Sequence, residues 1–200
     1  GKGILPTPAI GGVGILPDIS KRMTVAFKAA GEAIVVIGET KGHLGQSIYA
    51  RDILALREGA PPAVDLAAER RNGDFVRGEI RSGALSAVHD VSDGGIVAAV
   101  AEMAIASGIG ARIEAPSDLP LHAWAFGEDQ ARYVVTLPED AATALLERAA
   151  GAGVPAARIG RTGGAELTLD GCNPISLQRL KTAHESWLPA YMAAAPAEAL

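Results

Sequence analysis

The chain has 200 residues, of which 48% are apolar and 20% are charged, and its formal net charge is −5. That length suits one domain with a substantial core, and there is no basic stripe of the kind that binds nucleic acid. No apolar run approaches the roughly 20 residues that span a bilayer, so we expect no membrane partner. The single cysteine, Cys172, can form neither an internal disulfide nor a cysteine-based metal site, which fits a cytoplasmic protein.

The first 20 residues predict an extended arm. They carry three prolines and five glycines, a composition typical of linkers. They have neither an initiator methionine nor the apolar core and cleavage site of a signal peptide. We therefore expect a chain cut from a longer protein, in which residues 1–20 are a linker from a preceding domain and lie on a neighbour.

The next elements mix strands and helices. Residues 23–28 and 33–37 predict a strand pair with its turn at Gly31-Glu32, and the continuous apolar run 33–37 is typical of a central strand. A glycine-rich polar loop at 38–47 leads into a predicted helix over 46–57. A second helix over 65–81 is acidic at its start and basic at its end, as the helix dipole favours.

The second half continues the alternation. It predicts a strand at 86–89, a helix at 95–107, a strand at 111–114, a strand region at 122–127 and 132–137, a helix at 139–150, strands at 157–160 and 166–169, and a helix at 177–188. The order favours an α/β (α+β) fold, a three-layer domain in which helices flank a mixed β-sheet. We assign residues 21–190 to that domain and residues 191–200 to a frayed Ala/Pro-rich tail.

The motif with the strongest chemical character follows the strand at 86–89 and opens the helix at 95–107. Its candidate phosphate-loop residues are His89, Asp90, Ser92, Asp93, Gly94 and Gly95. Free N–H groups at a helix start suit an anion, and the two aspartates suit Mg²⁺. Alternatively, Ser92 or Asp93 caps the helix and the glycines permit a tight turn; this structural interpretation is favoured because carboxylates without a metal repel phosphate. His89 is a candidate general base, but a hydrogen-bonded structural role is favoured.

The loop at 38–47 is a second, weaker candidate phosphate cradle. Its candidate residues are Lys41, Gly42, His43, Gln46 and Ser47. It lacks the Gly-Lys-Ser/Thr ending of a P-loop, so a glycine-rich surface turn is the favoured alternative.

The segment 126–130 lies between apolar runs. Glu128 and Gln130 suit contacts with a polar ligand at a sheet edge, and an acidic hairpin turn is an equal alternative. The charges of the 65–81 helix predict a solvated face with helical salt bridges. Trp124 and Trp187 are interpreted as packing residues. No catalytic residue and no metal site is assigned.

Three stretches in this order and spacing resemble a known family. They are Leu5-Pro6-Thr7-Pro8-Ala9-Ile10-Gly11-Gly12-Val13-Gly14, Gly38-Glu39-Thr40-Lys41-Gly42-His43-Leu44-Gly45-Gln46-Ser47, and His89–Gly95 continued by Glu102-Met103-Ala104. The family is the large subunit of phosphoribosylformylglycinamidine synthase, of which the chain resembles the C-terminal quarter. At 127–132 the family often has Glu-Ser-Gln, and Asp129 departs from that pattern. The element at 89–95 alone is shared with aminoimidazole ribonucleotide synthetase, selenophosphate synthetase, thiamine monophosphate kinase and the hydrogenase maturation dehydratase.

The resemblance implies a function for the longer protein. That enzyme uses ATP and Mg²⁺ to convert formylglycinamide ribonucleotide, with ammonia from glutamine, into the amidine, ADP and phosphate in purine biosynthesis. Its partners are a glutaminase subunit and a small accessory subunit. The resemblance places this chain in the second of two α/β copies, beside the remainder of the large subunit. Glu128 and Gln130 match a substrate-binding element of the first copy, and in this copy they face an auxiliary site or act structurally.

We accordingly expect a fragment that is inactive alone and binds no nucleotide tightly. Two alternatives stay open. One is a complete small ATP-using phosphotransferase of the same superfamily, which rests on the loop at 89–95 alone. The other is a non-catalytic scaffold domain whose arm packs on a partner.

Overall fold

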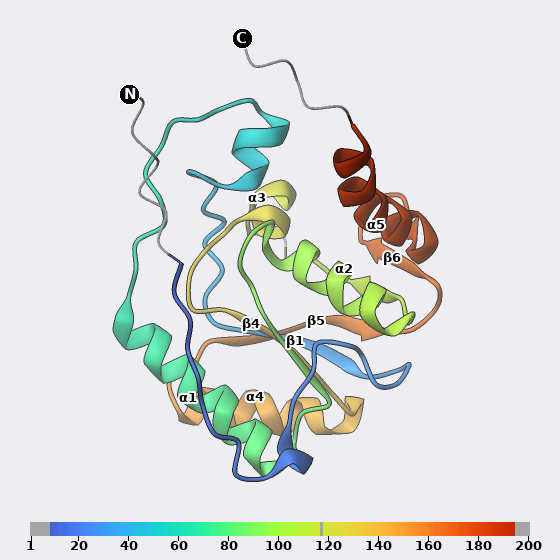
Figure 1. Cartoon of the computed structure of the whole chain (residues 1–200). Coiled ribbons are helices and arrows are strands. Elements are labelled where there is room, and N and C mark those ends of the chain that lie inside the picture. The colour runs from blue at the N-terminus through green and yellow to red at the C-terminus, as the bar shows by residue number, and fades with distance from the viewer. Residues whose placement is uncertain (1–8, 117, 195–200) are drawn as a thin grey trace.

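One seven-stranded mixed sheet forms the centre of the molecule, described by a computed structural model for residues 9–116 and 118–194 (Figure 1). The strand order is β2-β4-β1-β5-β3-β6-β7. Only β3 and β6 pair in parallel among the described strands, which confirms the predicted mixed sheet. The strands are β1 (Ala33–Ile37), β2 (Ala87–Asp90), β3 (Ala111–Ile113), β4 (Tyr133–Leu137), β5 (Ala156–Thr162), β6 (Glu166–Leu169) and β7 (Ile175–Ser176).

Helices cover both faces of this sheet, which makes three layers, as Figure 1 shows with α2 on one side and α1 and α4 on the other. The α-helices are α1 (Leu66–Ser82), α2 (Gly95–Ser107), α3 (Leu121–Phe126), α4 (Ala142–Gly151) and α5 (Leu177–Ala193). Strand β1 explains the arrangement. All five of its residues are buried, and successive side chains point to opposite faces. Ala33, Val35 and Ile37 therefore join the core under α1 and α4, while Ile34 and Val36 join the core under α2.

The helix boundaries follow from local chemistry. Asp65 caps α1 by accepting hydrogen bonds from Ala67 and Ala68, and Gly83 ends this helix in the left-handed conformation. Helix α2 begins after Gly94 and ends at Gly108, both with positive φ, so its predicted bounds are confirmed. The predicted solvated face of α1 is also found, where Asp74 pairs with Arg70 and Arg77.

Three predicted elements are wrong. Residues 23–28 form no strand, and β1 pairs instead with β4 and β5. The helix expected at 46–57 is reduced to one π-helical turn, η2 (Tyr49–Ile53), because Gln46 and Ala55 on either side have φ of 60° and 55° and so leave the helical region. Residues 122–126 belong to helix α3 rather than to a strand, and Gly127 is the residue that ends this helix. Pro120, whose φ suits the position before a helix, precedes it.

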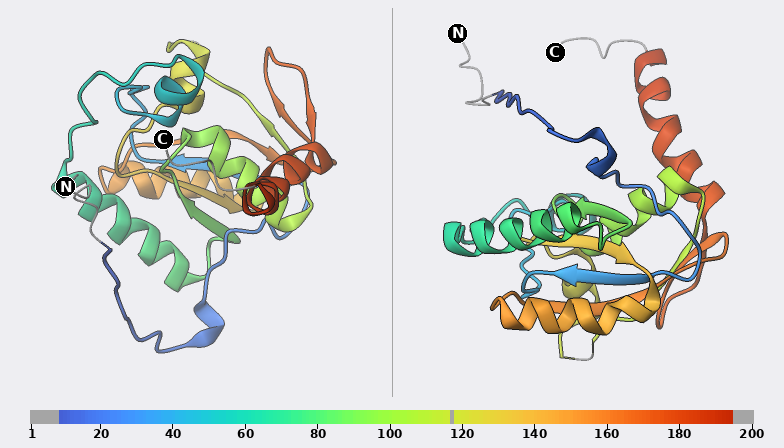
Figure 2. Two further views of the ribbon diagram at one scale, coloured as in Figure 1. Left: turned by 45° about the horizontal axis from the view of Figure 1, so that its top comes forward. Right: turned by 90° about the horizontal axis from the view of Figure 1, so that it is seen from below.

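Two elements project from the body. Residues 9–18 run extended and exposed before the 3-10 turn η1 (Ile19–Lys21), and α5 continues past the predicted residue 188 to Ala193. Figure 2 shows the arm and the end of α5 rising from the same side of the sheet. The arm's residues 1–8, and the tail from 195 onward, lie outside the described residues. None of the helices in the described part is both long and apolar enough to cross a bilayer.

Candidate functional site

The three candidate segments meet at one edge of the sheet. The loop 38–47 follows β1, the loop 91–94 follows β2, and residues 127–132 lead into β4. Because β4 lies between β1 and β2 and runs antiparallel to both, its start faces their ends: Tyr133 is opposite Ile37 and opposite Asp90. The topology therefore brings together segments that lie about 90 residues apart in the sequence.

Glu128 joins two of these segments. Its Oε1 accepts hydrogen bonds from the backbone N–H of Ile48 at 2.8 Å and of Gly94 at 2.9 Å. Its own N–H donates to the carbonyl of His43 at 2.9 Å. The start of α2 is thus occupied by a carboxylate of the same chain. The expectation that Ser92 or Asp93 caps this helix is wrong, because Gly94 is the capping residue and both side chains are exposed.

The carboxylate of Asp129 binds the backbone of the loop 38–47. Its Oδ2 accepts from the N–H groups of Lys41 at 2.9 Å and Gly42 at 2.8 Å, and its Oδ1 accepts from that of His43 at 3.2 Å. The residue is only 7% exposed. The sequence showed Asp129 as a departure from the family pattern, and its contact with residues 41–43 was missed because the partners are more than 80 positions away.

Arg132 is the buried cation of the junction. Its side chain is fully buried, and its guanidinium lies 3.7 Å from Asp129 Oδ2. Nε donates to the carbonyl of Asp129 at 3.0 Å and Nη2 to that of Gly127 at 2.6 Å. Burial lowers the pKa of Arg132, while the carboxylates of Asp129 and Glu128 oppose that shift. The guanidinium nevertheless stays charged at physiological pH, so the junction contains a desolvated ion pair.

The other predicted residues of the 38–47 loop hold it in shape. Lys41 pairs with the exposed Glu39, and His43 Nε2 lies 2.9 Å from the carbonyl of Ala60. Gln46 donates to the carbonyls of Arg57 and Gly59. Ser47 donates to the carbonyl of Leu44 and accepts from the N–H of Ala50. These contacts support the interpretation of this loop as an internally bonded turn.

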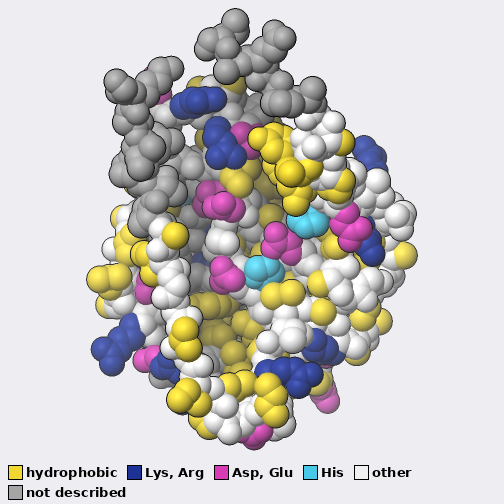
Figure 3. Space-filling view, in the orientation of Figure 1, with side chains coloured by type: hydrophobic (Ala, Val, Ile, Leu, Met, Phe, Trp, Pro, Cys, Tyr) yellow, Lys and Arg dark blue, Asp and Glu magenta, His cyan; other side chains and the backbone are white. Residues whose placement is uncertain are grey.

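His89, near the end of β2, contacts two carboxylates. Its Nε2 lies 2.6 Å from Glu102 Oε2, and its Nδ1 lies 3.2 Å from Asp90 Oδ1. Acidic side chains and histidines gather near the middle of the face in Figure 3. Within the described ranges, however, no group of three or more His, Cys, Asp or Glu side chains is arranged to hold a metal ion.

Gly95 is required for close packing. A Cβ at this position would lie 2.7–2.8 Å from the carbonyls of Gly127 and Ala125 and from the backbone carbon of Phe126, and the residue has a φ of 72°. The backbone that approaches this glycine is therefore the chain's own connection between α3 and β4. At the start of α2, the Gly94 N–H and the space over Gly95 are therefore both used internally.

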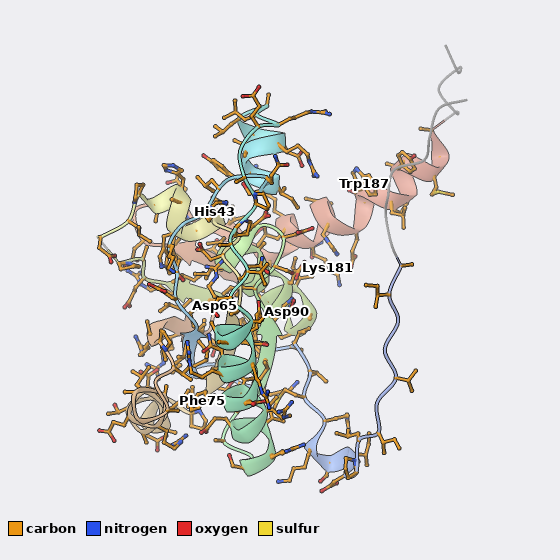
Figure 4. The ribbon with its side chains drawn as sticks, turned by 90° about the vertical axis from the view of Figure 1, so that its left-hand side faces the viewer. His43, Asp65, Phe75, Asp90, Lys181 and Trp187 are labelled. Carbon is orange, nitrogen blue, oxygen red and sulfur yellow. The ribbon has the colours of Figure 1, made fainter. Side chains whose placement is uncertain are left out.

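A pocket of about 510 Å³ adjoins Asp129. Its charged and polar lining includes Lys41, Asp65, Arg71 and Gln130. In Figure 4, His43 and Asp65 lie on one side of the molecule near the start of α1. The two sequence candidates of segment 126–130 therefore differ: Glu128 is engaged in the junction, whereas Gln130 is exposed beside the pocket.

The mixed sheet, the helices on both faces and the glycine-rich loops closed at one edge define a three-layer α/β domain. The family described as AIR synthase related protein, C-terminal domain, matches residues 29–170, and the chain belongs to this family. It is 68% identical over 97% of its length to phosphoribosylformylglycinamidine synthase subunit PurL of Parvibaculum lavamentivorans, and 60% identical over 97% to the protein of that name in Rhodopseudomonas palustris strain BisA53. It covers 26% of each of those proteins, so the chain spans about a quarter of their length.

Solved structures agree on the fold. The Thermotoga maritima PurL structure complexed with ATP superposes with a TM-score of 0.66 at 16% identity, over 82% of this chain and 28% of that one. A HypE–HypF complex structure gives a TM-score of 0.55 at 16% identity, over 78% of this chain and 55% of that one. At these identities the likeness concerns the fold alone.

Proposed function

We propose that this chain is a domain of a phosphoribosylformylglycinamidine synthase large subunit. The observation that carries the proposal is the 68% identity to a relative of that name over nearly the whole chain. The longer protein then uses ATP and Mg²⁺ to convert formylglycinamide ribonucleotide and glutamine-derived ammonia into formylglycinamidine ribonucleotide, ADP and phosphate. Its partners are the remainder of the large subunit, a glutaminase subunit and a small accessory subunit, in the cytoplasm.

Within that enzyme we assign this chain to a non-catalytic α/β copy. The support is chemical. Catalysis on phosphates needs donors aimed at the ligand. Here the N–H groups of residues 41–43 donate to Asp129, and that of Gly94 donates to Glu128. A buried donor that already has a charged acceptor gains little from exchanging it for another anion. The domain therefore supports neighbouring domains, and residues 1–20 connect it to them.

The test is an activity assay on two proteins. Amidine formation is measured with glutamine and with ammonia for the isolated 200 residues and for the longer native protein. We expect turnover from the longer protein with its partner subunits and none from the isolated chain. Turnover by the isolated chain contradicts the non-catalytic assignment, and a longer protein without this activity contradicts the proposed enzyme.

A complete small phosphotransferase is the weaker candidate. It would need the loop at 89–95 to present free N–H groups to a nucleotide. The Gly94 N–H donates instead to Glu128, and Asp90 lies against His89. These contacts favour the domain of a larger enzyme.

A further inference from the structure

We propose that the backbone at residues 41–43 is an oxyanion-binding site that the chain fills with its own Asp129. Asp129 is then the residue that excludes phosphate-bearing ligands from this loop. The proposal concerns the chain's own residues, so it holds whether or not the proposed enzyme is correct.

The backbone of residues 41–43 has the geometry of an oxyanion-binding site. Three successive N–H groups, of Lys41, Gly42 and His43, converge on one carboxylate at 2.8–3.2 Å. Successive N–H groups converge in this way only when the backbone turns between conformations of opposite hand, and Gly42 supplies the turn with a φ of 74°. Such concave arrangements bind phosphate or carboxylate oxygens in many proteins, and here the bound oxygens belong to residue 129.

A buried cation, Arg132, lies beside these donors. The Arg132 guanidinium lies 3.7 Å from Asp129 Oδ2 and is shielded from solvent. A guanidinium with nearby N–H donors is the arrangement that binds an oxyanion most strongly. Without the Asp129 carboxylate, the buried Arg132 would lose the stronger of its two anionic neighbours and keep only the weaker influence of Glu128, which is unfavourable. The site thus favours a second anion, and an exogenous one can take that place if Asp129 does not.

A pocket gives solvent access to this site. Asp129 lines the pocket of about 510 Å³, together with Lys41 and Arg71. This volume falls within the range of small-molecule sites. An oxyanion can therefore reach residues 41–43 from solvent once the Asp129 carboxylate is removed. Without Asp129, the two cations of the wall balance the carboxylates of Glu39 and Asp65.

The test compares three variants of the chain with the wild type. Asp129→Ala removes the carboxylate. Asp129→Asn keeps the shape of the side chain but turns one acceptor oxygen into a donor that cannot face an N–H group. Asp74→Ala removes an exposed carboxylate from α1 and is the matched control for charge. Inorganic phosphate is titrated at constant ionic strength against chloride, and the backbone amide signals of Lys41, Gly42 and His43 are followed by NMR.

We expect saturable shifts at these three amides in Asp129→Ala, with an affinity at least about tenfold higher than any seen for the wild type, Asp129→Asn or Asp74→Ala. If Asp129→Ala does not fold in chloride, phosphate should restore its folded spectrum. The proposal is overturned if Asp129→Ala, folded in chloride, shows no shift at residues 41–43. It is equally overturned if phosphate fails to restore an unfolded variant, or if all four proteins respond alike.

Discussion

The junction around Glu128, Asp129 and Arg132 and the two projecting elements are opposites. In the junction, Asp129 and Arg132 are buried and Glu128 is half-buried. The two carboxylates accept from backbone groups of other segments, and Arg132 donates to carbonyls of its own segment. The projecting elements expose apolar side chains instead, namely Ile10, Val13, Ile15 and Leu16 on the arm and Trp187, Leu188, Tyr191 and Met192 on α5. The difference teaches that the chain itself supplies acceptors for the N–H donors of the ligand-like junction. The apolar side chains of the projecting elements, in contrast, are left uncovered by the described residues.

The largest effect is expected when the cation of the junction is removed. Arg132→Met leaves the Asp129 carboxylate buried without its charge partner, and two carbonyls lose their donors. Breaking a buried pair on one side costs about 3–5 kcal/mol. Urea unfolding should show this loss of unfolding free energy. A loss below about 1 kcal/mol would mean that the ion pair does not hold the loops together.

A smaller loss is expected at Glu128. Glu128→Ala leaves the N–H groups of Ile48 and Gly94 without this acceptor. Because both groups are only partly buried, water replaces part of the lost bonding, and we expect a loss of about 1–3 kcal/mol in total. The neighbouring Gln130→Ala is the control. It should change the unfolding free energy by less than about 0.5 kcal/mol, because Gln130 is exposed. Equal losses in the two variants would break the contrast between them.

The helix cap at Asp65 gives a pH-dependent effect. Hydrogen bonds from the N–H of Ala68 lower the pKa of Asp65 below its ordinary value of 3.8, with a further contribution from Ala67 and from Arg71. A lowered folded-state pKa means that the stabilisation is present above the unfolded value and is lost as pH falls through the folded value. The stability difference between wild type and Asp65→Asn should therefore shrink below pH 3.8, as followed by thermal unfolding. A difference that is constant from pH 6 to pH 2 would argue against the cap.

The smallest effect on the isolated chain is expected on the second half of α5. Trp187 is 65% exposed and stacks on Tyr191, with ring centroids 5.3 Å apart (Figure 4). The interpretation of this tryptophan as a packing residue is therefore wrong within the described part of the chain. Trp187→Ala should change the unfolding free energy of the chain by less than about 0.5 kcal/mol. In the longer protein the same change should lower stability more. Equal changes in both proteins would mean that α5 does not pack on another domain.

Local patterns predicted those parts of the fold that local chemistry decides. Helix α2 was bounded by its two glycines, Gly94 and Gly108, and β1 by its unbroken apolar run. The buried Trp124 packs as expected. The strand expected at 122–127 failed because apolar residues over six positions suit a short buried helix as well as a strand, and only the packing of α3 against α2 decides between them.

The site was predicted only in part, since its contacts are long-range. Glu128 was recognised as a candidate, but its acceptor role depends on Gly94, which the sheet brings near it across 34 positions. The bonding of Asp129 to residues 41–43 depends on the pairing of β1 with β4. The one sequence signal was the aspartate at a position where the resemblance leads one to expect serine.

Calorimetry of the wild-type chain with MgATP tests the central claim most directly. If Glu128 and Asp129 already occupy the donors of both loops, the heat of injection should match that of dilution up to about 1 mM nucleotide, which corresponds to a binding free energy weaker than about −4 kcal/mol. Saturable binding with a micromolar dissociation constant would contradict the account, because it would show that the loops accept phosphate while those carboxylates are in place.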